Sequence, residues 1–411
     1  MAAAGSEDPV RVGIDVTSLL DAITGIGTFV HEAVEGLAAR PDVDLHAFAV
    51  TWRGRDRLAT VVPRGACRHV RPLPARVARL AWARSSHPSA RLLVGAVDVV
   101  HGPNFVVPPG GGAAEVATVH DLTALHHPEM CTADVLEWPH LLRRALRRGA
   151  WVHTVSSFVA DELADAFPEA AGRIVVVPNG VRVPPPADAT TDAGAGHHLA
   201  GGERYVLAVG TIEPRKHLVS LIAAFESLAD GDPDLRLVVA GGDGLGAEVV
   251  HAAARSSRHS VRISMLGRVD GASAPPCCAA SVVAYPSLYE GFGLVPLDAM
   301  AVGTPVVATA PAPSPRWWPT PRCSSRPAMP TRWRRGCGAS STTTPSRPAW
   351  SMLAGAGSPT SPGSAPSTGS STSTAPQLPP ADQAPADQAE GAPSAPAPPG
   401  SDVASGSGLS W

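Results

Sequence analysis

Cysteine is scarce in this chain of 411 residues, and its six cysteines show no C-x-x-C spacing. The only close pair, Cys277 and Cys278, is adjacent in sequence and unsuited to ordinary disulfide geometry. No run of 18 apolar residues occurs, and the opening MAAAGSEDPV has acidic residues and no apolar core. These absences speak against a disulfide scaffold, a membrane span and a secretory signal, so we expect a cytoplasmic protein.

A strong charge of either sign is also lacking, since the formal net charge is -3 at pH 7. We therefore expect no nucleic-acid partner. Arginines do gather locally, because residues 57–91 contain no Asp or Glu and Arg143, Arg144, Arg147 and Arg148 follow on one expected helix. Two interpretations stay open: a solvated basic face, or contact with an anionic membrane surface or a phosphorylated acceptor.

The length suffices for two α/β domains, each with its own core. Short β-branched runs alternate with helical patterns, which predicts parallel sheets covered on both faces. We expect a first domain over residues 9–182, a linker over 183–203, where Pro, Ala, Gly and Thr break the periodicity, and a second domain over 204–309. The expected strands are 10–14, 45–50, 97–101, 116–120, 151–155, 174–177, 205–210, 235–240, 262–266, 281–285 and 305–308, and the expected helices include 27–37, 157–166, 218–228 and 295–302.

The composition changes abruptly after Thr309. Residues 310–411 hold 20 of the 43 prolines and only four acidic residues, a composition from which no core can be built. We expect a low-complexity, disordered tail and an incomplete second domain. A natural tail is one explanation. Our hypothesis is a frameshift near residues 309–314, because Pro315 to Trp318, read one base earlier in G/C-ending codons, can become Pro-Glu-Val-Val. The run 272–278 is a second patch that looks disturbed.

The most specific pattern is YPSLYEGFGLVPLDAM, from Tyr285 to Met300. A strand ends, Gly291 and Gly293 let the backbone approach a ligand, and a helix begins with unpaired amides, which suits a diphosphate. Glu290 and Asp298, separated by seven residues, can accept hydrogen bonds from sugar and ribose hydroxyls. Acids favoured at a helix start by its dipole would explain either acid alone, but not the whole string.

This string resembles the donor-site motif of retaining glycosyltransferase family 4, in which Glu, seven residues and Glu recur. Here the second acid is Asp298. The resemblance implies the GT-B fold, in which two Rossmann-like doubly wound domains face a cleft. It also implies that Glu290 meets the donor sugar and Asp298 the nucleotide ribose. The donor is further expected to contact Gly291, Phe292, Gly293 and Leu294.

The stretch VGTIEPRKHL from Val209 looks like the family loop whose basic side chains hold the donor pyrophosphate. Arg215 and Lys216 are expected to stabilise the charge that develops on the leaving nucleoside diphosphate. The alternative is an exposed basic pair at a helix start, where cations are disfavoured without an anion. Gly210 in this loop and Gly241 in the glycine-rich turn after the next strand are also expected at the donor.

In the first domain, TGIGT from Thr24 follows the first strand and opens a helix. It lacks the third glycine of the dinucleotide fingerprint, which speaks against a nicotinamide cofactor. In enzymes of the resembling family this loop faces the donor, so Gly25 and Gly27 are expected near it. His120 ends another strand, at the edge where ligands bind in open α/β sheets, and is expected to contact the donor sugar. A structural histidine is the alternative.

The resemblance implies that the chain moves a hexose from a nucleotide diphosphate sugar to a hydroxyl with retention. Its Glu-Pro-Arg-Lys loop looks like that of enzymes that build bacterial cell-surface polysaccharides. This favours GDP-mannose over a UDP-sugar, and a glycan or lipid-linked acceptor. No metal or other cofactor is expected, because Arg215, Lys216 and the helix after Gly293 neutralise phosphate charge. The alternatives are an inactive truncated or frameshifted product and, on the same fold, a sugar-nucleotide epimerase.

The frameshift hypothesis predicts what the coding DNA contains. Resequencing from about codon 260 to the stop should reveal a base change that restores a Pro-Glu-Val-Val frame and an ordinary second domain. Confirmation of the present frame, or codons that do not permit that translation, would refute it.

Overall fold

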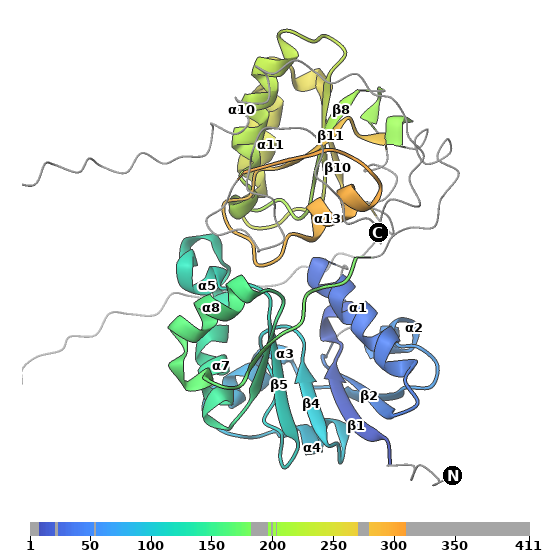
Figure 1. The fold of residues 1–411 in the computed structure, drawn as a ribbon, viewed down its shortest axis with the longest axis vertical. Helices are drawn as coiled ribbons and strands as arrows, with labels where there is room; N and C mark the ends of the chain where they lie inside the picture. The colour runs from blue at the N-terminus through green and yellow to red at the C-terminus, as the bar shows by residue number, and fades with distance from the viewer. Residues whose placement is uncertain are drawn as a thin grey trace, which may run out of the picture. The chain divides into compact units, whose positions relative to one another are not determined.

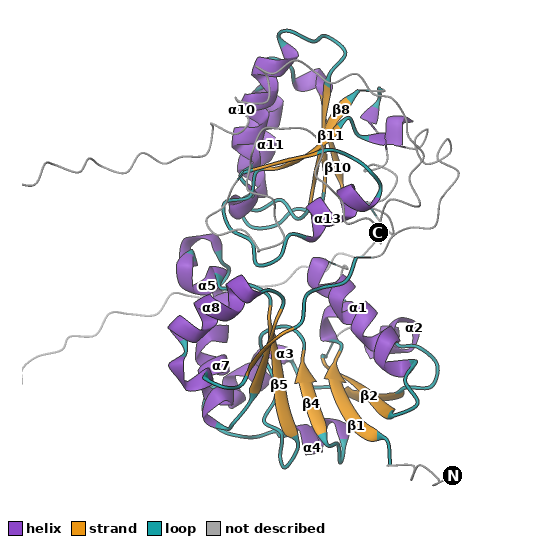
Figure 2. Ribbon diagram, in the orientation of Figure 1, coloured by secondary structure: helices purple, strands orange, loops and turns teal. Residues whose placement is uncertain are grey.

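The computed structural model describes residues 8–20, 24–52, 55–181, 196–198, 200–202, 204–269 and 279–309. These residues form two parallel β-sheets with helices packed on them (Figures 1 and 2). The expected α/β class is therefore confirmed. The first sheet lies within residues 9–182 and the second within 204–309, while these exact domain boundaries stay a prediction.

The first sheet has seven parallel strands in the order β3-β2-β1-β4-β5-β6-β7. The chain order reverses between β1 and β4, so the loops that leave these two strands diverge there. The strands are β1 (Val10–Asp15), β2 (Val43–Val50), β3 (Cys67–Arg71), β4 (Val99–Gly102), β5 (Ala114–Val119), β6 (Trp151–Thr154) and β7 (Ile174–Val176).

Helices cover both faces of this sheet, because successive residues of a strand point to opposite sides. In β2, Leu45 and Ala47 join a buried cluster with α1, whereas Phe48 and Val50 join a larger cluster with α3, α4, α7 and α8. The helices are α1 (Gly25–Ala38), α2 (Leu58–Val61), α3 (Ala75–Trp82), α4 (Ala90–Val94), α5 (Thr123–His126), α6 (Ala133–Leu136), α7 (Trp138–Arg147) and α8 (Ser157–Ala166), with 3-10 turns at Thr17–Leu19, Arg55–Arg57, Pro128–Met130 and Pro168–Ala170.

The second sheet has five parallel strands in the order β10-β9-β8-β11-β12, and its chain order reverses between β8 and β11. Apolar side chains of α10 and α11 pack on one face, and those of α13 pack on the other. The elements are β8 (Tyr205–Val209), β9 (Arg236–Ala240), β10 (Ile263–Gly267), β11 (Val282–Tyr285), β12 (Val306–Ala308), α10 (Leu218–Ala229), α11 (Ala247–Ser256) and α13 (Leu294–Ala301), with 3-10 turns at Pro214–Lys216 and Ser260–Arg262.

The predicted strands all form, with ends that differ by one or two residues, but the sequence does not predict β3 or α11. β3 has the sequence CRHVR and, within the described residues, pairs only with β2 at the sheet edge, where polar side chains reach water. α11 buries only Ala247, Val250 and Ala254, so its apolar stripe is too weak to stand out.

The predicted linker lies outside the described residues except at 196–198 and 200–202, and the predicted tail, 310–411, lies wholly outside them. The run 272–278 lies outside them as well. Across the ranges that the structure does describe, no helix is long and apolar enough to cross a membrane.

Many arginines of the two basic stretches bind groups of their own domain. Arg148 Nη2 lies 2.8 Å from Glu115 Oε2, on a carboxylate whose side chain is only 8% exposed. Further contacts join Arg68 to the Val62 carbonyl, Arg71 to the Leu93 carbonyl, Arg79 to Asp134 and Glu137, Arg143 to Glu169, and Arg144 to the Trp82 carbonyl. These charges thus hold the domain together, and contact with an anionic membrane stays a prediction.

Candidate functional site

Two loops meet where the chain order of the second sheet reverses. The loop 286–293 leaves β11 and leads into α13, and the loop 210–217 leaves β8 and leads into α10. The Leu288 N–H donates to the Arg215 carbonyl oxygen at 2.8 Å, which ties the loops together. Gly293, at the start of α13, has φ 87°, a conformation that side-chain-bearing residues rarely adopt. Residues of both loops are therefore held at the strand ends where parallel sheets bind ligands.

A partly buried ion-pair network joins these two loops. Glu290 Oε1 lies 2.5 Å from Lys216 Nζ and 2.7 Å from Arg215 Nη1. Arg215 Nη2 lies 2.7 Å from Glu213 Oε1, so the guanidinium spans two carboxylates. Lys216 Nζ also lies 5.2 Å from the centre of the Tyr285 ring, within the range of a cation–π contact. The network thus places two cations and two carboxylates in one partly buried patch.

Burial and charge oppose each other in this network. Burial alone would raise the pKa of Glu290, but the charges of Lys216 and Arg215 outweigh it and hold that pKa at about 2. Burial disfavours the charged guanidinium of Arg215, yet Glu290 and Glu213 raise its pKa above the ordinary value. Glu290 is therefore an ionised carboxylate at neutral pH and can accept hydrogen bonds from cations or hydroxyls.

Glycines at this edge allow backbones to cross. A Cβ at Gly241 would lie 1.9 Å from the Gly210 carbonyl oxygen, and the Gly210 N–H donates to the Ala240 carbonyl oxygen. Gly210 itself has φ 129° and faces Lys216 Cε, which a Cβ would meet at 3.5 Å. The two glycines bring the loops after β8 and β9 into contact, which is a structural reason for their presence.

The loop after β11 also contacts the first domain. A Cβ at Gly291 would lie 1.8 Å from the His120 carbonyl oxygen, and Ser156 Oγ donates to the Gly291 carbonyl oxygen at 2.7 Å. The Tyr289 hydroxyl donates to Glu162 Oε2 at 2.6 Å and accepts from the Leu122 N–H at 3.0 Å. The loop that carries Glu290 is thus anchored on both sides of that residue.

Two family models match this chain. The family model described as Glycosyltransferase Family 4 matches residues 23–183, and the model described as Glycosyl transferases group 1 matches residues 192–317. Both models describe glycosyltransferases, and the chain belongs to the family that they describe together.

Curated relatives of this chain also carry glycosyltransferase names. O-antigen chain mannosyltransferase B of Escherichia coli is 31% identical over 218 residues, which cover 51% of this chain and 56% of that protein. D-inositol 3-phosphate glycosyltransferase of Segniliparus rotundus is 33% identical over 210 residues, which cover 48% of this chain and 46% of the relative. The chain therefore spans about half the length of the curated relatives that it matches.

Solved structures show the same fold. Sucrose-phosphate synthase from Thermosynechococcus elongatus matches with a TM-score of 0.58 at 20% identity, covering 74% of this chain and 82% of that chain. A glycosyltransferase involved in lipopolysaccharide biosynthesis matches with a TM-score of 0.53 at 17% identity, covering 73% and 81%. The two-domain GT-B fold that the sequence motifs imply is therefore confirmed.

The structure brings Arg215, Lys216 and Glu290 into direct contact, and it places the Gly291 backbone against the backbone of His120. The His120 side chain is held by a hydrogen bond between Nε2 and the Pro103 carbonyl oxygen at 2.8 Å. Burial lowers the pKa of His120, so its imidazole is neutral at pH 7. This environment accommodates both the predicted donor contact and the structural alternative.

Other predicted residues have structural tasks as well. The Phe292 ring is 7% exposed and joins the large hydrophobic cluster of the first domain, against which Leu294 also packs. Gly27 is buried at the start of α1, and its N–H donates to Thr24 Oγ1 at 3.4 Å. A Cβ at Gly25 would meet no atom within 4 Å, so crowding does not explain that glycine. Contact of these four residues with a donor stays a prediction.

Asp298 lies in the second turn of α13, and burial raises its pKa from 3.8 to about 6. Among the described residues no cation lowers that pKa, so nothing there offsets the effect of burial. A partly buried carboxylate in this state gains from any hydroxyl that donates to it.

Sequence reasoning missed Tyr289, Ser156, Glu162 and Glu213. Glu213 lies in the loop VGTIEPRKHL, two residues before Arg215, so the sequence offered a local indication that the two side chains pair. Tyr289 directly precedes Glu290, but nothing local indicates that its ring is 4% exposed within the cluster of the first domain. Its partner Glu162 is 127 positions away in sequence.

The raised pKa of Asp298 predicts a pH-dependent gain in stability for Asp298→Asn. The unfolded chain loses this proton near pH 4 and the folded chain near pH 6, so the folded chain loses stability as pH rises through that window. We expect the variant to be about 1–2 kcal/mol more stable above pH 6, a value discounted for partial exposure, and equal to the parent below pH 4.

Urea denaturation between pH 4 and 8 measures this difference. Glu248→Gln, at an exposed position of α11, is the matched control and should change little. A gain from Asp298→Asn that is independent of pH would contradict the assignment.

Proposed function

We propose that this glycosyltransferase moves a hexose from a nucleotide diphosphate sugar to a hydroxyl with retention at the anomeric carbon. In the proposal Arg215 and Lys216 bind the diphosphate, Glu290 binds the donor sugar, and Asp298 binds the ribose. His120 contacts the sugar from the first domain. The name of the Escherichia coli relative favours mannose as the sugar and a cell-surface polysaccharide as the product class.

One observation carries the proposal: the partly buried network of Glu290, Arg215 and Lys216 lies where the loops after β8 and β11 meet, at the reversal of strand order. Ligands of open α/β sheets bind at such reversals of strand order. Lys216 is also the only lysine among the 33 basic residues Lys and Arg. A lone lysine that lies partly buried beside an acid, in a chain otherwise supplied with arginine, supports a specific task for its amine.

The network supports binding of a diphosphate that replaces the carboxylates as the partner of Arg215 and Lys216. Two cations face two carboxylates in the network, so their charges cancel. A diphosphate that contacts Arg215 and Lys216 takes over their pairing, and Glu290 is then available to accept sugar hydroxyls. Cations held in a site that excludes water stabilise the charge that grows on the leaving diphosphate. Their fixed positions make a metal unnecessary for this task.

Removal of the Lys216 charge should lower donor turnover strongly. We expect Lys216→Met to reduce kcat/KM by roughly 100-fold or more, because a fixed group that stabilises transition-state charge is lost. Arg215 Nη1 lies 2.7 Å from Glu290 Oε1 in the parent chain, so the carboxylate should keep a partner in the variant and the fold should persist. The measurement is release of nucleoside diphosphate from GDP-mannose and from UDP-sugars, with a melting curve for each variant.

Lys216→Arg, which keeps the charge, is the matched control and should retain more activity than Lys216→Met. Labelling gives a second readout, since an amine reagent can modify only Lys216 and the chain's amino terminus. A bound donor should protect Lys216 from it. Full turnover by a folded Arg215→Ala, Lys216→Ala double variant would refute the roles assigned here.

The proposal also predicts how a chelator acts. Because Arg215 and Lys216 supply the positive charge at the diphosphate, turnover should stay within about twofold after exhaustive treatment with EDTA. Turnover that disappears with EDTA and returns with added Mg²⁺ or Mn²⁺ would contradict this part of the proposal.

A further inference from the structure

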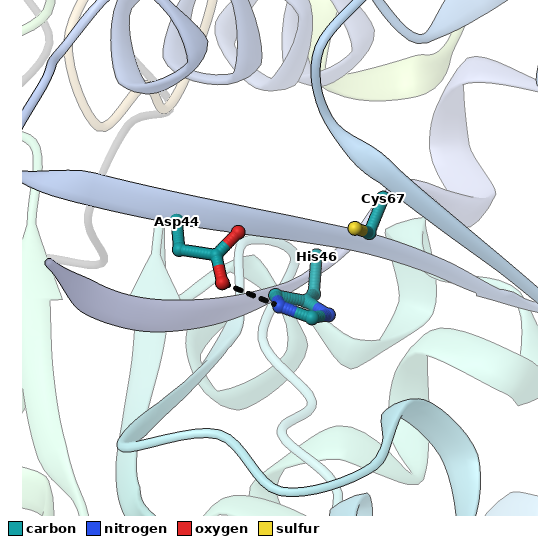
Figure 3. A group of neighbouring side chains, drawn as sticks. All are labelled: Asp44, His46 and Cys67. Carbon is teal, nitrogen blue, oxygen red and sulfur yellow. Dashed lines mark hydrogen bonds and ion pairs between the residues drawn. The ribbon is translucent and has the colours of Figure 1, made fainter.

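A group of metal-ligating side chains lies on the first sheet, away from the residues discussed above. Asp44 and His46 belong to β2 and Cys67 to β3, and Figure 3 shows the three side chains together. One ligand atom from each residue lies within 4.8 Å of the other two. His46 Nε2 and Asp44 Oδ2 are 3.2 Å apart.

Strand geometry creates this group. Side chains two positions apart point to the same face, so Asp44 and His46 share a face of β2 while Cys67 and His69 share a face of β3. β2 and β3 run parallel, with His46 opposite Cys67 in the register. An Asp-x-His segment is thus set beside a Cys-x-His segment on neighbouring strands.

The donors suit a borderline divalent cation. Thiolate sulfur, imidazole nitrogen and carboxylate oxygen are the ligands that Zn²⁺ takes in proteins. The carboxylate of Asp44 and the thiolate of Cys67 together carry two negative charges, which balance the charge of one such ion. The His46 side chain is 17% exposed and that of Asp44 is 43% exposed, while Cys67 is exposed, so the ion can enter from solvent.

His69 lies next to the three donors. Its Nε2 is 3.1 Å from His46 Nδ1, and the two rings stack with centroids 5.3 Å apart. A contact of this kind orients a ligating imidazole and selects its tautomer. When His46 binds a metal through Nε2, its Nδ1–H donates to His69.

The position of the group separates it from donor binding. Asp44 and His46 lie in the amino-terminal half of β2, and Cys67 is the first residue of β3. Ligands of parallel sheets bind at the opposite, carboxyl ends of the strands. Among the described strands, β3 lies at the edge and pairs with β2 alone. An ion bound by residues of both β2 and β3 would hold the edge strand β3 against β2.

We infer that Asp44, His46 and Cys67 form a zinc site that clasps the edge strand β3 to β2, with His69 positioning His46. The site is independent of sugar transfer and needs no contact with the donor. Without an ion, Asp44, His46 and His69 form only a chain of hydrogen bonds. A metal titration distinguishes a zinc site from this chain of hydrogen bonds.

The test is a titration of the full chain with Co²⁺, which reports thiolate coordination through its charge-transfer absorption. The protein is first stripped of metal by a chelator and kept under a non-chelating reductant. We expect one equivalent of Co²⁺ to bind with a thiolate band, Zn²⁺ to displace it, and Zn²⁺ to raise the Tm.

Cys67→Ser and His46→Gln should each remove that equivalent or weaken it at least tenfold. His69→Gln should weaken it by about tenfold while the thiolate band remains, as expected for a residue that orients a ligand. Cys131→Ser is the matched control, because that cysteine lies outside the group, and it should leave binding unchanged.

Absence of a thiolate band in the parent chain would overturn the inference, as would a band of equal stoichiometry and affinity in Cys67→Ser. Circular dichroism confirms the fold of each variant. Because Cys67 is exposed on an edge strand, the serine variant should fold like the parent.

Discussion

The pairing of Glu290 with Arg215 and Lys216 is the interaction on which the organisation of the second sheet's binding edge depends. A carboxylate removed from water costs several kcal/mol unless cations compensate it. Those cations, Lys216 and Arg215, lie 74 and 75 positions earlier in sequence, on the loop after a different strand. The loops after β8 and β11 must therefore meet, and the place where they meet is the reversal of strand order that positions a ligand.

Backbone proximity is the second constraint on this edge. Gly241 passes the Gly210 carbonyl, and Gly291 passes the His120 carbonyl, at distances that leave no room for a Cβ. The glycines of the motif therefore serve the packing of loops against one another as well as any approach of a ligand. For the same reason, the loop that holds Glu290 has little freedom, since Tyr289 and Gly291 on either side of it are both anchored.

The proposed donor site and the proposed zinc site lie at different places in the fold and share no residue. The carboxyl ends of the strands gather arginine, lysine and carboxylates from loops, which suits a phosphorylated donor. The edge pair β2 and β3 gathers carboxylate, imidazole and thiol from within the strands, where the period of two aligns them. The first arrangement depends on loop conformation, and the second depends only on register.

The sequence by itself determined the alternation of strands and helices, the two-domain family fold and the loop pattern for which donor binding is proposed, because periodicity and glycine-bounded strand ends are local signals. It did not predict β3, whose polar edge lacks an apolar pattern, or the small-residue stripe of α11. Only the tertiary structure decided that Tyr289 enters the first domain's cluster and that Cys67 faces His46. These contacts join residues far apart in the chain, and no local periodicity encodes which distant side chain completes a hydrogen bond or a register pair.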